Sequence, residues 1–228
     1  MGPNRSRPGR YGAKPVRFQW LALLLALLPW AAPAAATEAP VKLVVLGDSL
    51  SAGYGLPADQ AFPAKLSKAL ATKGIAVAIT NAGVSGDTAS DGLARVDWSV
   101  PDGAEAVIVE FGANDALRGI DPMLTKSALD KILSKLADRH VAVLLAGMQA
   151  PRNMGPDYVK AFDALYPALA STYPVVFYPF FLDGVATDAK LNQADGLHPN
   201  AAGVDMIVAR ILPRVEELIA RARKARGS

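Results

Sequence analysis

Four short polar segments hold the side chains of this chain that could do chemistry together. They are residues 47–53, 81–88, 110–115 and 195–200. The segments supply a hydroxyl at Ser49, an unobstructed backbone N–H at Gly83, a carboxamide at Asn114, and an imidazole at His198 three residues after the carboxylate of Asp195. A hydroxyl is a poor nucleophile unless a base lies beside it, and the anion formed on attack needs donors already in place. This combination is what an acyl-transfer site requires.

Each segment alone has a simpler interpretation. Serine after a strand commonly caps a helix, and glycine and asparagine commonly form turns. The prediction of chemistry therefore depends on whether the fold brings the four segments to one place.

The chain after residue 40 alternates strand-like and helix-like patterns. Apolar, β-branched runs occupy residues 41–46, 75–80, 106–110, 141–146 and 175–178. Most are apolar throughout, which is typical of strands buried on both faces. Helical patterns occupy residues 63–70, 121–136, 158–170 and 201–222. This order predicts an α/β fold, a three-layer α/β/α sandwich around a doubly wound, flavodoxin-like, five-stranded parallel sheet.

In such a sheet, ligands bind beyond the carboxyl ends of the strands. All four polar segments follow predicted strands, so they are expected to converge at that edge. His140 precedes a strand instead, at the opposite end of the sheet, and is predicted to be structural.

The first 36 residues have the pattern of a targeting segment. They contain Arg5, Arg7, Arg10, Lys14 and Arg17 and no acidic residue, then an apolar run over 20–30 and an alanine-rich end at 31–36. This pattern predicts a secretory signal peptide over residues 1–36, cleaved after Ala36, followed by one domain over 37–228. The apolar stretch is short for a membrane span and is interrupted by two prolines, so no stable anchor is expected after cleavage.

Composition excludes several other classes of protein. The chain has no Cys and only two His, which argues against disulfides, a thiol nucleophile and a metal centre built on these residues. Of the 24 Lys and Arg, five lie in the predicted leader, so 19 remain against 21 Asp and Glu. The predicted mature protein is therefore slightly acidic, and we expect no nucleic-acid partner.

The polar segments resemble the motifs of the SGNH (GDSL) hydrolases. The matching strings are LGDSLSAGY at 46–54, SGDT at 85–88, GANDALRG at 112–119 and DGLHPN at 195–200. The resemblance extends over almost all of residues 37–228. It is strongest to the bacterial periplasmic branch that contains acyl-CoA thioesterase I, lysophospholipase L1 and arylesterase.

The resemblance implies a role for each site residue. Ser49 would be the nucleophile, His198 its base, and Asp195 the group that orients the imidazole. The oxyanion hole would consist of the backbone N–H groups of Ser49 and Gly83 and the side-chain amide of Asn114. The resemblance implies no metal and no organic cofactor.

The substrate is predicted to be an ester or thioester with an apolar acyl or aryl group, such as a small acyl ester or a lysophospholipid. Met148 and Met154, in the loop over 147–156, and Phe181 are expected to form an adaptable apolar wall beside the acyl chain.

The leader predicts a periplasmic or secreted protein, which would rarely meet cytosolic acyl-CoA. Two alternatives stay open at this point: a carbohydrate O-deacetylase, and a non-catalytic lipid- or glycan-binding module.

Overall fold

The computed structural model describes residues 1–2, 9, 12 and 39–227. The chain divides into two units, Met1–Thr37 and Glu38–Ser228. The predicted signal peptide and its cleavage site lie almost wholly outside the described residues. In the second unit, no described helix is both long enough and apolar enough to cross a membrane.

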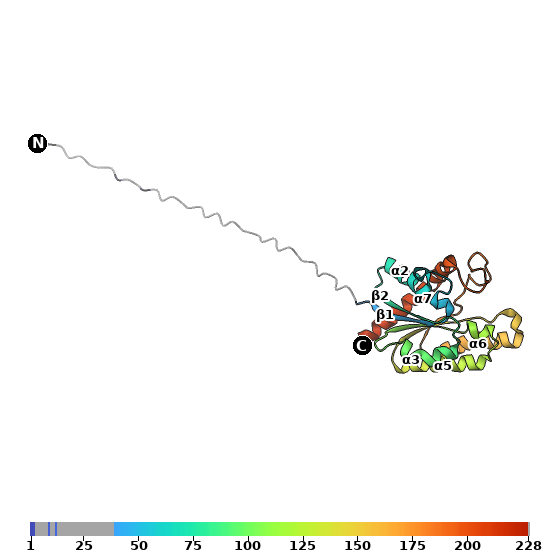
Figure 1. The fold of residues 1–228 in the computed structure, drawn as a ribbon. Coiled ribbons are helices and arrows are strands. Elements are labelled where there is room, and N and C mark those ends of the chain that lie inside the picture. The colour runs from blue at the N-terminus through green and yellow to red at the C-terminus, as the bar shows by residue number, and fades with distance from the viewer. Residues whose placement is uncertain (3–8, 10–11, 13–38, 228) are drawn as a thin grey trace. The chain divides into compact units, whose positions relative to one another are not determined.

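A five-stranded parallel sheet forms the centre of this unit. Figure 1 shows the sheet with helices on either side. Its strands are β1 (Val41–Gly47), β2 (Val77–Gly83), β3 (Ala106–Glu110), β4 (Ala142–Ala146) and β5 (Val176–Tyr178). The strand order is β2-β1-β3-β4-β5, and all pairs are parallel. The order reverses between β1 and β3, which is where a doubly wound sheet opens a crevice for ligands. The predicted α/β architecture is confirmed.

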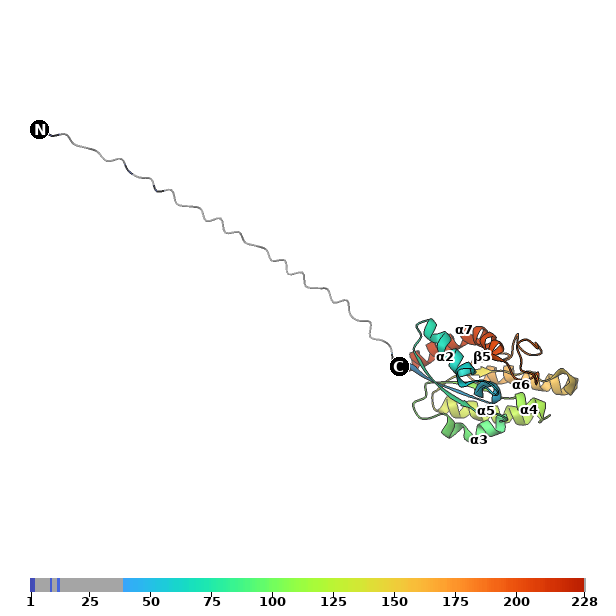
Figure 2. The same cartoon turned by 45° about the horizontal axis from the view of Figure 1, so that its top comes forward.

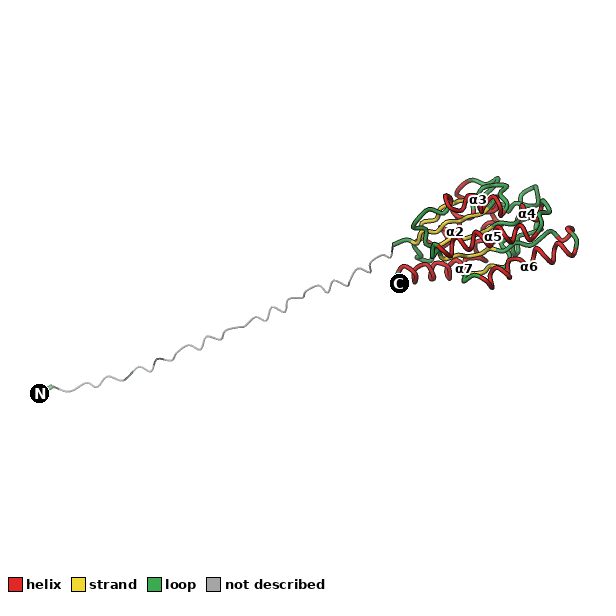
Figure 3. Tube along the Cα trace, turned by 90° about the horizontal axis from the view of Figure 1, so that it is seen from below, coloured by secondary structure: helices red, strands yellow, loops and turns green. Residues whose placement is uncertain are grey.

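Helices cover both faces of the sheet. The long ones are α2 (Phe62–Thr72), α3 (Ala89–Ser99), α5 (Pro122–Asp138), α6 (Pro156–Thr172) and α7 (Ala201–Arg226). Figures 1 and 2 show α2 and α7 on one face and α3, α5 and α6 on the other. Short helices α1 (Ser49–Ala52) and α4 (Ala113–Leu117) directly follow β1 and β3, and 3-10 turns occupy Ala58–Gln60 and Arg152–Met154. Figure 3 views the same unit from below, so that the helices (red) overlap the strands (yellow).

The burial of side chains agrees with the position of each strand and helix in the layers. β3 is buried along its whole length, as expected for a central strand covered on both faces. β2 is an edge strand, and its side chains are mostly half-buried or exposed. Helix α5 begins where Asp121 accepts the backbone N–H of Met123, and its buried stripe has helical spacing. The buried members of that stripe include Ala128, Leu129, Ile132, Leu133 and Leu136.

The structure differs from the sequence-based pattern at β2, which runs over Val77–Gly83 instead of 75–80, and at α3. No helical pattern was recognised between the second and third strands, where α3 lies. The buried residues of α3 are Ala89, Gly92, Arg95, Val96 and Ser99, whereas Trp98 is 72% exposed. The helix therefore has almost no apolar stripe, which is the signal that predicts an amphipathic helix.

Candidate active site

Ser49 is the first residue of α1 and directly follows the residue after β1. Asp48 is the N-cap of this helix, and its Oδ1 atom accepts the backbone N–H of Leu50 at 2.9 Å. This cap marks the turn from the end of β1 into α1. Ser49 stays 8% exposed there, at the crevice between β1 and β3.

His198 reaches Ser49 from the other end of the chain. The Nε2 atom of His198 lies 2.9 Å from Ser49 Oγ, and its Nδ1 atom lies 2.7 Å from Asp195 Oδ2. The ring of Tyr54 is tilted against the imidazole, with the ring centroids 4.6 Å apart. The three residues predicted as nucleophile, base and orienting acid are therefore within hydrogen-bond distance of one another in that order.

The loop itself keeps Asp195 ionised. Its Oδ1 atom accepts the backbone N–H groups of His198 at 3.0 Å and Leu197 at 2.9 Å. These bonds, with the contact to the His198 ring, lower the pKa of Asp195 from 3.8 to about 2. A carboxylate is therefore present beside Nδ1 across the neutral range, which favours the tautomer with the proton on that nitrogen.

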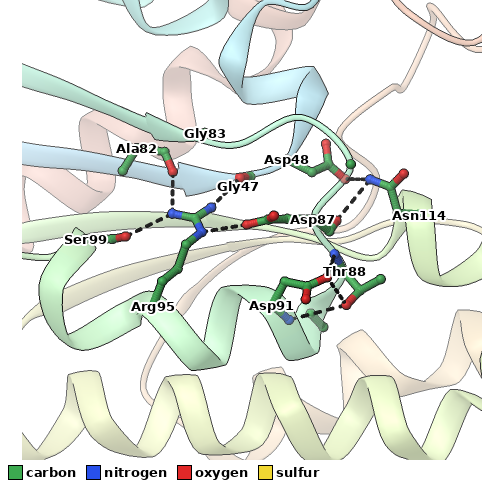
Figure 4. Close-up of polar contacts among 12 residues, drawn as sticks. Gly47, Asp48, Ala82, Gly83, Asp87, Thr88, Asp91, Arg95, Ser99 and Asn114 are labelled. Carbon is green, nitrogen blue, oxygen red and sulfur yellow. Dashed lines mark hydrogen bonds and ion pairs between the residues drawn. The ribbon is translucent and has the colours of Figure 1, made fainter.

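Asn114 lies on α4, immediately after β3. Its Nδ2 atom donates to Asp48 Oδ2 at 3.2 Å and to the backbone oxygen of Asp87 at 3.0 Å, as Figure 4 shows. Both amide hydrogens therefore have partners in the free protein. The same two bonds fix the amide between the β1 and β2 ends of the crevice.

Gly83 was expected to offer an unobstructed backbone N–H, but in the structure this N–H already has a partner. Its backbone N–H donates to the side chain of Asn81 at 3.0 Å. A Cβ at Gly83 would collide with the backbone of Ala52 and lie 3.0 Å from the carbonyl oxygen of Asp48. Glycine is needed here because α1 packs against the end of β2, and this reason is unrelated to the approach of a substrate.

Gly86, in the loop between β2 and α3, has the free backbone N–H that was expected at Gly83. Its φ of +90° suits glycine, and its N–H has no hydrogen-bond partner among the described residues. The next residue, Asp87, is the one whose carbonyl oxygen accepts from Asn114. The motif string at 85–88 is the sequence feature that could have directed attention to Gly86.

Two buried carboxyl groups, of Asp48 and Glu110, lie where β1 and β3 end beside α1, and no role was predicted for either. Glu110, at the end of β3, is fully buried and accepts the hydroxyl of Ser51 at 2.8 Å. Burial, with the nearby charge of Asp48, raises the pKa of Glu110 well above its usual value. Burial likewise raises the pKa of Asp48 to about 7, against the opposing N–H bonds from Leu50 and Asn114.

A cavity of about 600 Å³ opens beside Ser49 and His198. Its other lining residues include Leu117, Met148, Ala150, Pro151, Phe180, Leu182, Ala186 and Leu197. Most of this lining is apolar, and Arg152, Gln149 and Asn192 add polar groups. The cavity can therefore take an apolar group next to the Ser49 hydroxyl.

Of the three predicted wall residues, only Met148 lines this cavity. Phe181 is fully buried and packs edge-on against Phe62, with the ring centroids 5.1 Å apart, so it belongs to the core. Its chain neighbours Phe180 and Leu182 line the cavity instead. Met154 lies with its methyl group beside Gly119, away from the cavity lining.

The remaining predictions concern His140 and the metal centre that composition argued against. His140 is exposed in the turn before β4, at the end of the sheet opposite Ser49. Within the part of the chain that the structure describes, no group of three or more His, Cys, Asp or Glu side chains is arranged to hold a metal ion.

Comparisons with known proteins agree with this architecture. A model of the GDSL-like Lipase/Acylhydrolase family matches residues 45–206. An arylesterase from Vibrio mimicus is 41% identical over 180 residues, which cover 77% of this chain and 88% of that protein. Thioesterase 1/protease 1/lysophospholipase L1 from Escherichia coli (strain K12) is 37% identical over 198 residues, covering 86% and 91%. The crystal structure of TesA, 38% identical, matches with a TM-score of 0.74 over 78% of this chain and 99% of its own.

These matches define the chain as a carboxylic ester hydrolase. Within that class it belongs to the GDSL-like lipase/acylhydrolase family, as its motifs predicted. A non-catalytic binding module is therefore not supported.

Proposed function

We propose that the protein hydrolyses esters of apolar acyl or aryl groups through an acyl-enzyme on Ser49. The single observation that carries this proposal is the contact series from Asp195 through His198 to Ser49 at the mouth of an apolar cavity. The Ser49 oxygen attacks the ester carbonyl carbon while His198 Nε2 takes the hydroxyl proton. His198 then gives that proton to the departing alcohol or thiol. Water, activated by the same nitrogen, releases the acid and restores Ser49.

The negative oxygen of the tetrahedral intermediate needs donors at the crevice. The backbone N–H of Ser49 and the side-chain amide of Asn114 are our candidates, as the sequence analysis expected. For the third donor we take the N–H of Gly86 in place of that of Gly83, because the Gly83 N–H already donates to Asn81. The oxyanion would replace the longer of the two Asn114 bonds, the one to Asp48.

The substrate class follows from the cavity. Apolar side chains such as Met148, Phe180 and Leu182 would gain little from an acetyl group but would bury a longer chain or a ring. The names of two relatives, an arylesterase and a thioesterase with lysophospholipase activity, fit aryl esters, thioesters and lysophospholipids. A carbohydrate O-deacetylase would not need this apolar lining, because its acyl group is only an acetyl group.

The sequence of residues 1–36 indicates where the protein acts in the cell. Their basic start, apolar run and alanine-rich end support export to the periplasm or beyond. Lysophospholipids and monoacyl or aryl esters are the substrates that such a location would supply. Sequencing the N-terminus of the protein recovered from its native host tests this, because export with cleavage gives Thr37 as the first residue, and retention of Met1 contradicts it.

Initial rates on p-nitrophenyl esters from two to sixteen carbons test the activity and the substrate class together. We expect kcat/KM to rise from two carbons to at least six, and Ser49→Ala to lose several orders of magnitude on every ester. A preference for the acetyl ester with no activity at six carbons would overturn the apolar-acyl proposal. Retained activity in Ser49→Ala would overturn the acyl-enzyme.

A further inference from the structure

Arg95 is a buried arginine on α3 that sequence analysis did not single out. Its side chain is 8% exposed and donates four hydrogen bonds, which Figure 4 shows. Nε donates to Asp87 Oδ2 at 2.6 Å, and one terminal nitrogen donates to the carbonyl oxygen of Gly47 at 2.9 Å. The other terminal nitrogen donates to the carbonyl oxygen of Ala82 at 2.7 Å and to Ser99 Oγ at 3.0 Å.

Three of these bonds reach the two chain segments that bear the candidate donors of Ser49 and Gly86, whereas the bond to Ser99 stays within α3. Gly47 ends β1, two residues before Ser49. Ala82 and Asp87 lie on either side of Gly86, at the end of β2 and in the loop that follows. The backbone oxygen of Asp87 in turn accepts from Asn114, so the guanidinium is linked to that donor through one residue, as Figure 4 shows.

The surroundings of Arg95 hold the guanidinium in one place. The ring of Phe111 lies against it, with 5.7 Å from the guanidinium carbon to the ring centroid. Gly92, one turn earlier on α3, lets this ring approach, because a Cβ there would collide with it. Close packing of α3 on Phe111 therefore sets the distance between the helix and the ends of β1 and β2.

The start of α3 is fixed to the site as well. Thr88 and Asp91 form a reciprocal capping box, in which each side chain accepts the other residue's backbone N–H. The next backbone N–H, of Ala89, donates to Asp115 Oδ2 at 3.0 Å, and Asp115 is the neighbour of Asn114. Helix α3 is thus anchored beside Asn114 at its first turn and to β1 and β2 through Arg95.

We propose that Arg95 is a positioning residue that aligns the oxyanion donors at the start of α1, on the loop after β2 and on α4. This inference rests on the proposed function, since it assumes that these groups bind the oxyanion. Donors stabilise a transition state only when they are already in place, and an error of about 1 Å in their position costs about 100-fold in rate. A guanidinium can bond three segments at fixed angles, whereas an ammonium acts as a compact point charge.

The test compares Arg95→Lys with Arg139→Lys. Arg139 is a matched control, because it also donates to two backbone carbonyl oxygens, of Val100 and Pro101, but at the opposite end of the sheet. We expect Arg95→Lys to lower kcat on p-nitrophenyl hexanoate by about 10- to 100-fold with KM within about threefold. A trifluoromethyl ketone that forms a tetrahedral adduct should bind more weakly by a similar factor. Arg139→Lys should change neither quantity, whatever it does to Tm.

A double-variant cycle with Asn114→Ala separates positioning from general loosening of the fold. If Arg95 acts through the donors, Arg95→Lys costs less in the Asn114→Ala background than in the wild type. If Arg95→Lys does not fold, Asp87→Asn is the second variant. It keeps the side-chain volume but weakens the ion pair with Arg95, and it should lower kcat in the same way.

Several results would overturn the proposal. These are an unchanged kcat in Arg95→Lys, a change in KM alone, equal kcat losses in Arg95→Lys and Arg139→Lys, or full additivity with Asn114→Ala. Ser49→Ala is measured alongside. If it is inactive while Arg95→Lys behaves like the control, only the positioning role fails, whereas activity in Ser49→Ala would remove the proposed function itself.

Discussion

The carboxylate of Asp195 holds His198 by both its side chain and its backbone. Its Oδ2 atom lies 2.7 Å from the ring Nδ1, and its Oδ1 atom accepts the backbone N–H of the same residue at 3.0 Å. These two contacts within one loop thus fix the ring so that its other nitrogen, Nε2, lies 2.9 Å from Ser49 Oγ. The base is oriented before any substrate arrives.

Asp195→Asn should therefore lower kcat by about 1000-fold or more, because an amide no longer selects the tautomer with the proton on Nδ1 or stabilises the imidazolium. Steady-state rates on p-nitrophenyl hexanoate measure the effect. Asp188→Asn is the control, since Asp188 lies in the same region, accepts the backbone N–H of Lys190, and does not line the cavity. A loss below tenfold in Asp195→Asn would contradict the assigned role.

Asp48 makes a distinct prediction about stability and pH. Burial raises the pKa of Asp48 from 3.8 to about 7, so between these values the folded chain keeps a proton that the unfolded chain has released. Raising the pH through this window therefore favours unfolding. The wild type should lose stability relative to Asp48→Asn as the pH rises from about 4 to about 7. Urea denaturation of both proteins at several pH values measures the difference, and a constant difference would contradict the prediction.

The cavity predicts how chain-length preference can be changed. Ala186 lines the cavity, so Ala186→Phe should fill part of its volume. We expect kcat/KM on octanoate esters to fall by about tenfold, with less than a twofold change on acetate esters, because only the longer chain needs the lost space. Ala137→Phe, at an exposed position of α5, is the control. Equal losses on both esters would show that the acyl chain lies elsewhere.

Much of the site could be predicted from the sequence because a parallel sheet brings all its carboxyl ends to one edge. Ser49, Asn114 and His198 each follow a strand, and their motif strings are distinctive, so both their neighbourhood and their roles could be named. The contact between Ser49 and His198 spans 149 residues, yet strand order alone makes it expected.

Arg95 could not be predicted in the same way. The buried face of α3 consists mainly of small and polar side chains with Val96, so no apolar period marks the helix. The Thr88-x-x-Asp91 pattern was the available signal for its start. Nothing local indicates that the guanidinium reaches the carbonyl oxygen of Gly47, because that bond depends on how the helix packs against β1.

The structure places three predicted residues, Gly83, Met154 and Phe181, differently from expectation, and local reasons explain Gly83 and Phe181. The neighbouring side chain of Asn81 takes the Gly83 N–H, and no pattern in the sequence distinguishes that bond from a free donor. The run Phe180-Phe181-Leu182 is apolar at every position, so periodicity cannot say which side chain faces the core. Packing against Phe62 decides that it is Phe181.

Trapping the acyl-enzyme is the sharpest test of whether Ser49 is the nucleophile. The protein over residues 37–228 would be mixed with excess p-nitrophenyl hexanoate, quenched in acid within milliseconds, digested, and its peptides weighed by mass spectrometry. We predict one hexanoyl group on the hydroxyl of Ser49 and none in Ser49→Ala or on Ser51, its neighbour in the same helix. Rapid hydrolysis with no adduct at any quench time, or an adduct on a different residue, would contradict the account.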